Sequence, residues 1–182
     1  MTETKKDPGT ATLVVVLFLI CLVTSLLLGL TNEVTAPFIE ANNWKTTQEA
    51  MNAVLPADEY TDVTADYAGG DATVEAVYQA GDAGYVVQVS PPTSFSGNLT
   101  IMVGGDSSYA CTGISVTSTG ETSGLGSNAS RPSFADQFIG KTGTVAVTKD
   151  GGDINAITGA TITSRGVSEA VTSAIAAAAS MG

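Results

Sequence analysis

The stretch TVEAVYQAGDAGYVVQVS, from Thr73 to Ser90, holds two runs rich in Val and Tyr, Thr73–Gln79 and Tyr85–Ser90. Side chains of this kind favour β-strands, whereas Gly and Asp favour tight turns. Gly81-Asp82-Ala83-Gly84 lies between the runs, where a hairpin connection belongs. The stretch therefore predicts an antiparallel hairpin and sets the fold of the chain around it.

The hairpin continues downstream. Leu99–Val103 and Ala110–Thr119 have the same strand composition, and Gly104-Gly105-Asp106 connects them, so a meander of antiparallel strands is expected. Val145–Thr148 predicts a further strand, and the alanine-rich Ser164–Ser180 predicts a helix. The fold class that follows is α+β, an antiparallel-sheet domain with flanking helices.

Upstream of the strands, Ala11–Leu30 reads ATLVVVLFLICLVTSLLLGL. As a helix these residues would extend about 30 Å, the thickness of the hydrocarbon core of a bilayer. We expect one transmembrane helix here. Thr31–Asn43 then predicts a membrane-exit linker broken at Pro37, and the spacing of Trp44–Leu55 predicts a helix that Pro56 stops.

A cleavable signal peptide is the competing interpretation, because Lys5 and Lys6 make a basic start and Val34-Thr35-Ala36 faintly resembles a cleavage site. The apolar run is longer than usual for a signal peptide, which favours an anchor. The lysines on one flank, against Glu33 and Glu40 on the other, predict a cytoplasmic N-terminus. The expected organisation is a cytoplasmic segment 1–10, a span 11–30, a linker 31–43 and an extracytoplasmic domain 44–182.

Composition excludes several classes of function. The 182 residues include 18 acidic and 7 basic side chains, a net charge of −11, and no histidine. Catalysis that needs an imidazole is therefore excluded, as are most zinc sites. An acidic surface makes nucleic acid a poor partner. Cys21 and Cys111 are the two cysteines, and one lies within the expected span, so no disulfide between them and no four-cysteine cluster is expected.

Two segments rich in glycine and hydroxyl side chains are candidates for a site. The first is Gly120-Glu121-Thr122-Ser123-Gly124-Leu125-Gly126, where glycines permit the close approach of a flat ligand and Leu125 offers an apolar contact. An ordinary glycine-punctuated loop is the alternative, and composition alone favours it.

The second segment runs from Asp153 to Ser164 and includes Thr158-Gly159-Ala160-Thr161, between an expected strand and an expected helix. An anion there would meet backbone N–H groups and the positive end of the helix dipole. Plain capping of the helix by a Thr or Ser side chain is the alternative, and the residues alone favour it. Arg165 is either a further phosphate contact or a solvated side chain.

These features resemble the FMN-binding domain shared by the G subunit of the Rnf electron-transport complex and the C subunit of the sodium-pumping NADH:quinone reductase. The resemblance covers the chain and is close for the Rnf G subunit. The short length of the chain also favours the Rnf G subunit over the larger C subunit of the reductase. It is carried by the single N-terminal span, the segment Leu30-Thr31-Asn32-Glu33-Val34-Thr35, the Glu121–Gly126 motif and Thr158-Gly159-Ala160-Thr161. The last motif is the most specific.

The resemblance implies that Thr161 carries FMN as a phosphoester, formed by a separate flavin transferase that uses FAD. It further implies that Asp153 and Thr158, Gly159 and Ala160 form the recognition sequence of the transferase. The flavin pocket would contain Glu121, Thr122, Leu125 and Gly126. The chain departs from the family pattern at Ser118-Thr119-Gly120, where histidine is frequent, and at Ser123, where proline is frequent.

The function implied is that of an electron-transfer subunit rather than an enzyme by itself. Its partners would be other membrane subunits of a complex that couples electron flow between ferredoxin and NAD to sodium or proton movement. Two alternatives stay open. One is a flavinylated extracellular electron-transfer domain outside an Rnf complex, and the other is a membrane-tethered assembly protein without redox function.

Overall fold

The structure is a computed structural model that describes residues 9–95, 99–120 and 125–182, and it divides into two compact units, Met1–Lys45 and Thr46–Gly182. Helix α1 (Thr10–Val54) contains the predicted span. Among the described residues it is the one helix long and apolar enough to cross a membrane, and its most apolar window is 0% buried. The orientation of the span stays a prediction.

The break expected at Pro37 is absent, because α1 is helical on both sides of it. Proline removes one N–H donor, so the carbonyl of Glu33 one turn earlier receives no bond from position 37. The residues on both sides of Pro37 stay helical although this one hydrogen bond is missing. The predicted helix at Trp44–Leu55 is confirmed to Val54 as the last part of α1.

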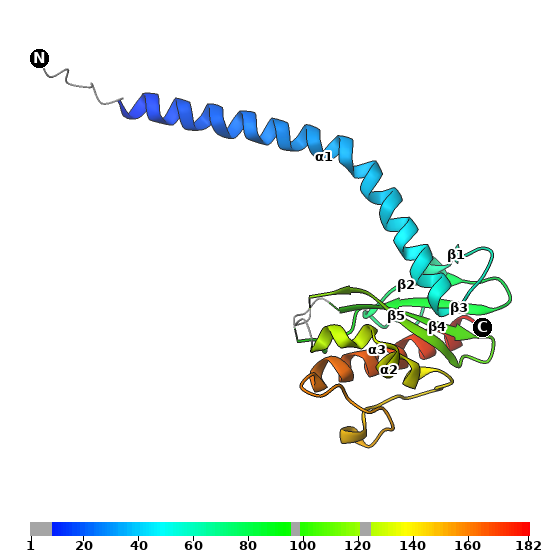
Figure 1. Cartoon of the computed structure of the whole chain (residues 1–182). Helices are drawn as coiled ribbons and strands as arrows, with labels where there is room; N and C mark the ends of the chain where they lie inside the picture. The colour runs from blue at the N-terminus through cyan, green and yellow to red at the C-terminus, as the bar shows by residue number, and fades with distance from the viewer. Residues whose placement is uncertain (1–8, 96–98, 121–124) are drawn as a thin grey trace, which may run out of the picture. The chain divides into compact units, whose positions relative to one another are not determined.

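The predicted meander is confirmed as one antiparallel sheet with the strands in sequence order (Figure 1). Its strands are β1 (Thr61–Asp62), β2 (Val74–Gln79), β3 (Gly84–Val89), β4 (Leu99–Asp106) and β5 (Cys111–Thr119). The sequence did not predict β1, which has only two residues and pairs through Asp62 with Tyr78. With flanking helices, the sheet confirms the α+β class.

Both faces of the sheet are covered, which explains the nearly continuous apolar runs in its central strands. On one face, side chains such as Val87 and Ile101 pack with Val171 of helix α3 (Thr161–Met181). On the other, Val86 and Met102 pack with the end of α1. Alternate residues of a strand point to opposite faces, so each strand supplies both layers. Figure 1 shows α3 lying along its face of the sheet.

Close packing of α3 depends on Gly166, at which a β-carbon would overlap the carbonyl oxygen of Thr93. Glycine is a poor helix former, but at position 166 any larger residue would collide with the backbone of Thr93. The contact holds the loop after β3 against the first turns of α3. Phe95 lies two residues beyond Thr93, and so it is brought to the same end of the helix.

The strand predicted at Val145–Thr148 is wrong. Val147 forms only a single parallel bridge with Ile154, and the chain then enters a short 3₁₀ helix, η4 (Thr148–Asp150). Gly151 has φ +87°, and a β-carbon on Gly152 would overlap the backbone of Ala146. The two glycines make a turn too tight for a strand to continue. The turn places residues 148–150 beside the start of α3.

Short helices complete the domain: η1 (Thr64–Asp66), η2 (Gly126–Ser130), α2 (Pro132–Ala135) and η3 (Asp136–Phe138). Phe134 and Phe138 are buried, and their rings meet edge to face with centroids 5.3 Å apart. This aromatic pair joins the core beneath α3 and anchors the segment that follows Leu125.

Candidate functional site

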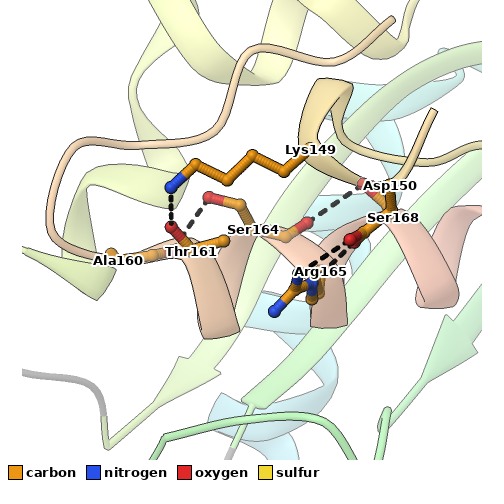
Figure 2. A network of polar contacts seen from close by, with 7 residues as sticks. All are labelled: Lys149, Asp150, Ala160, Thr161, Ser164, Arg165 and Ser168. Atoms are coloured by element: carbon orange, nitrogen blue, oxygen red, sulfur yellow. Dashed lines mark hydrogen bonds and ion pairs between the residues drawn. The ribbon is translucent and has the colours of Figure 1, made fainter. Parts of the chain in front are cut away.

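The turn that leads into α3 is held by the hydroxyl group of Ser164. Its Oγ accepts a hydrogen bond from the N–H of Ile157 at 2.9 Å and donates one to the carbonyl of Ala160 at 2.9 Å. The side chain of Ser164 is 0% exposed. Buried hydrogen bonds of this kind are costly to remove, so they fix the path of the chain into the helix and the place of Thr161 (Figure 2).

Gly159 gives this turn its shape. Its φ is +80°, a conformation that residues with a side chain rarely adopt, and a β-carbon there would lie 3.1 Å from Cδ2 of Leu125. The glycine therefore serves two purposes. It permits the turn, and it leaves room for Leu125, which lies within the other glycine-rich segment.

Thr161 is the first residue of α3, and Ala160 occupies the cap position. Capping of this end by a Thr or Ser side chain, the alternative that the sequence favoured, is wrong, because alanine has no group that can cap. The first turn of a helix presents backbone N–H groups without partners inside the helix, and the helix dipole makes this end attractive to anions. The hydroxyl of Thr161 is thus not used as a cap.

A cavity of about 380 Å³ opens at the start of α3. Its volume lies within the range of small-molecule sites. Three large apolar side chains on its wall are part-exposed: Phe95 at 69%, Leu125 at 42% and Ile162 at 46%. Among the described residues, the lining consists of Phe95, Leu125, Gly126, Lys149, Gly159, Ala160, Thr161, Ile162 and Thr163. An apolar wall therefore meets a polar helix start.

Lys149 supplies positive charge to this wall. Its side chain extends from η4, and Nζ lies 3.3 Å from Oγ1 of Thr161 (Figure 2). An ammonium group has three N–H donors. The contact places a cation directly at the hydroxyl group that the family resemblance singles out.

Arg165 does not line the cavity. Its Nε and Nη2 donate to the two carboxylate oxygens of Asp150 at 2.6 and 2.7 Å, a bidentate ion pair (Figure 2). The hydrogen bonds from Arg165 hold the pKa of the Asp150 carboxyl below its usual value. The Arg165 side chain is 42% exposed, so it is a solvated side chain that is also paired with Asp150, and the phosphate contact stays a prediction.

Two predicted recognition residues lie outside the cavity lining. Thr158 is exposed on the turn. Asp153 forms an ion pair with Lys141, and hydrogen bonding by the lysine lowers the pKa of the aspartate carboxyl. The Asp153 side chain is still 64% exposed. Both residues are therefore accessible from solvent.

The chain is similar to known proteins of one family. Residues 94–176 match the family model described as an FMN-binding domain, and the matched range contains the cavity-lining residues found in the described part of the chain. The chain is 33% identical over 181 residues to the G subunit of the Na⁺-translocating ferredoxin:NAD⁺ oxidoreductase complex of Acetobacterium woodii, covering 88% of this chain and 87% of that protein. It is 31% identical over 171 residues to the G subunit of the ion-translocating oxidoreductase complex of Methanosarcina acetivorans, covering 89% and 90%.

The chain belongs to this G-subunit family. The resemblance to the Rnf G subunit seen in the sequence is confirmed. Among solved structures, the chain is similar to the C subunit of the Na⁺-translocating NADH-quinone reductase of Parabacteroides distasonis, with 25% identity, a TM-score of 0.48, and coverage of 73% of this chain and 80% of that one.

In this G-subunit family member, the structure brings the two glycine-rich segments together. Five residues singled out in the sequence share the cavity wall: Leu125, Gly126, Gly159, Ala160 and Thr161. Glu121 and Thr122 lie outside the described residues, together with Ser123 and Gly124. The roles assigned to all of these residues remain predictions.

Sequence reasoning missed two residues of the wall, Phe95 and Lys149, whereas Ile162 and Thr163 lie within the second candidate segment, Asp153–Ser164. Phe95 and Lys149 lie in other loops, and no local pattern marks either one. Only the packing of those loops against α3 brings them to the site.

Proposed function

We propose that this chain is the flavin-carrying electron-transfer subunit of an Rnf-type complex, with FMN joined covalently to Oγ1 of Thr161. The observation that carries the proposal is the position of this hydroxyl group. It lies on the wall of a 380 Å³ cavity, at a helix N-terminus, 3.3 Å from the ammonium group of Lys149. The family match over residues 94–176 and the naming of both relatives as complex subunits support it.

Attachment transfers the FMN half of FAD to the threonine. A bond forms between Oγ1 of Thr161 and the phosphorus of FMN, the P–O bond of the FAD pyrophosphate breaks, AMP leaves, and the hydroxyl proton is released. A flavin transferase is the partner for this step. The exposure of Thr158 and of Asp153 suits their proposed place in its recognition sequence, since an enzyme must reach them.

The cavity fits the chemical nature of FMN. Lys149 and the start of α3 suit the phosphate, because cations and helix N-termini favour anions. Phe95, Leu125 and Ile162 suit the flat ring system, because all three present apolar surface to the same space. FMN supplies one-electron and two-electron redox chemistry when bound, and the residues of the chain hold and orient it.

Covalent attachment keeps the cofactor on a domain that we propose faces away from the cytoplasm, anchored by Ala11–Leu30 with the N-terminus inside. The proposed electron partners are other membrane subunits of the complex, which couples electron flow between ferredoxin and NAD to sodium or proton movement. The name of the Acetobacterium relative specifies sodium for that protein. For this chain, transport of sodium and of protons is measured in vesicles that contain the assembled complex, and this measurement identifies the coupled ion.

Mass spectrometry tests the attachment. The full chain is co-expressed with a flavin transferase and denatured, and its mass and in-gel flavin fluorescence are measured. Wild-type protein is expected to carry one FMN-sized increment, as is Thr161→Ser, which keeps a hydroxyl group. Thr161→Ala is expected to lose both signals, whereas Thr142→Ala, an exposed threonine outside the cavity lining, keeps them. Flavin retained on Thr161→Ala would contradict the assignment.

Purification under mild conditions tests whether the chain is part of a membrane complex. Co-purification of this chain with other membrane subunits supports membership of a complex, whereas a yellow chain that purifies alone supports a separate electron-transfer route. A colourless chain from a host that contains the transferase would support the assembly-protein alternative. That alternative assigned Thr161 the role of capping α3, and Thr161 is not the cap of this helix.

A further inference from the structure

We propose that Lys149 neutralises the phosphate charge at Thr161, and that Arg165 keeps Lys149 available by occupying the neighbouring carboxylate of Asp150. This inference rests on the proposed attachment of FMN at Thr161. It assigns to Lys149 direct contact with the phosphate and to Arg165 a positioning role that acts through Lys149.

The backbone that carries Lys149 is held in place. The N–H of Thr148 donates to the carbonyl of Ile154 at 2.8 Å, and the N–H of Gly152 donates to the carbonyl of Val147 at 3.1 Å. Because the turn is closed by these bonds, and because Gly152 leaves no space for a β-carbon, Lys149 extends from a defined point. Its long side chain needs no rearrangement of the fold to reach Thr161.

The distance favours contact with an attached phosphate. Nζ of Lys149 lies 3.3 Å from Oγ1 of Thr161 before any ester is formed. A phosphoester places its phosphorus one bond from that oxygen atom, so its charged oxygens come within reach of the same ammonium. Hydrogen bonds from an ammonium to a phosphate are charge-assisted and therefore stronger than neutral ones.

The charge of the surroundings makes this cation important. The chain carries a net charge of −11, which opposes the approach of an anionic group. Among the described residues that line the cavity, Lys149 is the one with a positive side chain. Arg165 and Lys141 lie nearby in the sequence, but each is paired with an aspartate.

Asp150 is the natural competitor for Lys149, because it is the next residue and carries the opposite charge. Arg165 donates to both of its carboxylate oxygens (Figure 2). Arg165 lies one helical turn after Thr161, so the Lys149–Thr161 hydrogen bond and the Arg165–Asp150 ion pair both join the same loop to the same helix. With Arg165 in place, the ammonium of Lys149 is directed to Thr161 instead of Asp150.

The first experiment measures initial rates of FMN attachment to the purified, flavin-free full chain in detergent, with purified transferase and FAD. Lys149→Met is expected to slow attachment about tenfold, the value of one hydrogen bond to a charged group, and Lys149→Arg to recover most of it. Arg131→Met is the matched control, since it removes the same charge from an exposed position outside the cavity lining. Equal melting temperatures of the flavin-free proteins exclude misfolding.

The second measurement uses the flavinylated proteins. The ³¹P resonance of the native Lys149→Met protein is expected to differ from that of wild type, and the two are expected to coincide after denaturation. Arg131→Met is expected to match wild type in both states. A Lys149→Met protein that matches Arg131→Met in either the attachment rate or the native ³¹P shift would overturn the role of Lys149.

A rescue tests Arg165. Arg165→Met is expected to slow attachment, because the unpaired Asp150 then attracts Lys149, and Asp150→Asn in the same chain is expected to restore the rate. If the double variant stays as slow as Arg165→Met, the positioning role is wrong. Failure of the proposed function is distinguishable from these outcomes, since it would appear as a wild-type chain without FMN or as FMN retained on Thr161→Ala.

Discussion

Gly159 lies directly against Leu125, so that a β-carbon on the glycine would be 3.1 Å from Cδ2 of the leucine. This contact joins the two glycine-rich segments of the sequence at one wall of the cavity. It links the turn before α3 to the segment that the family resemblance assigns to the flavin pocket. Neither segment contains any local indication of the other.

Replacing Gly159 by alanine tests this contact. Gly159→Ala is expected to lower the free energy of unfolding by about 1–2 kcal/mol, because alanine is strained at a φ of +80°. Close contact of the new β-carbon with Leu125 is expected to lower it further. The matched control is Gly140→Ala, with φ +78° and nothing near its β-carbon position, which has the backbone cost alone. Chemical denaturation measures both. Leu125→Ala combined with Gly159→Ala is expected to remove the difference, and a Gly159→Ala protein no less stable than Gly140→Ala would contradict the crowding.

Gly166 gives a second prediction, in which packing outweighs helix propensity. Alanine at a helix interior usually stabilises by about 1 kcal/mol relative to glycine. Here its β-carbon would overlap the carbonyl of Thr93, so Gly166→Ala is expected to destabilise by about 1–3 kcal/mol. Glu169→Ala, at an exposed position of the same helix, is expected to change stability by less than about 0.5 kcal/mol. A Gly166→Ala protein more stable than wild type would contradict this prediction, because it would show that the loop at Thr93 moves away from the new β-carbon at little cost.

Thr161 and Ser164 are expected to separate function from stability. Without flavin, Thr161→Ala is expected to change the free energy of unfolding by less than about 0.5 kcal/mol, because Ala160 occupies the cap position. Ser164→Ala is expected to cost about 1–3 kcal/mol, because the buried hydroxyl serves both Ile157 and Ala160. Denaturation of the two flavin-free variants checks the contrast. A loss of about 1 kcal/mol or more in Thr161→Ala would restore the capping interpretation.

Asp106 is expected to make stability depend on acidic pH. Its carboxylate accepts hydrogen bonds from the hydroxyl of Ser108 and from the N–H groups of Ser108 and Ala110, and these lower its pKa from the ordinary 3.8, the Ser108 side chain contributing most. A lowered folded pKa stabilises the protein above the unfolded pKa, and this contribution is lost as the pH falls through the folded value.

The test compares Asp106→Asn with wild type between pH 7 and pH 2. At neutral pH the variant is expected to be less stable by about 1 kcal/mol, the worth of a hydrogen bond to a charged group reduced by solvent screening at an exposed turn. The difference is expected to shrink below the ordinary pKa of 3.8, as the wild-type carboxylate becomes protonated. A difference that stays constant over this range would contradict the role of the charge.

Much of the fold follows from local sequence patterns. The Val-rich and Tyr-rich runs of the hairpin at Thr73–Ser90 correctly predicted β2 and β3, and the alanine-rich segment correctly predicted α3. Strand and helix preferences of this kind act between residues that are close in the chain. Val145–Thr148 shows the limit, because its strand composition was overridden by the turn at Gly151 and Gly152.

The sequence by itself determined the apolar span, the α+β class, and the threonine at the start of the last helix. Tertiary structure alone decided that Ala160 is the cap, that Arg165 pairs with Asp150, and that Phe95 and Lys149 belong to the cavity. The physical reason is that hydropathy and propensity depend on neighbours within a few residues. A cavity wall depends on which distant loops the packed core holds against one helix end, and no local pattern records that.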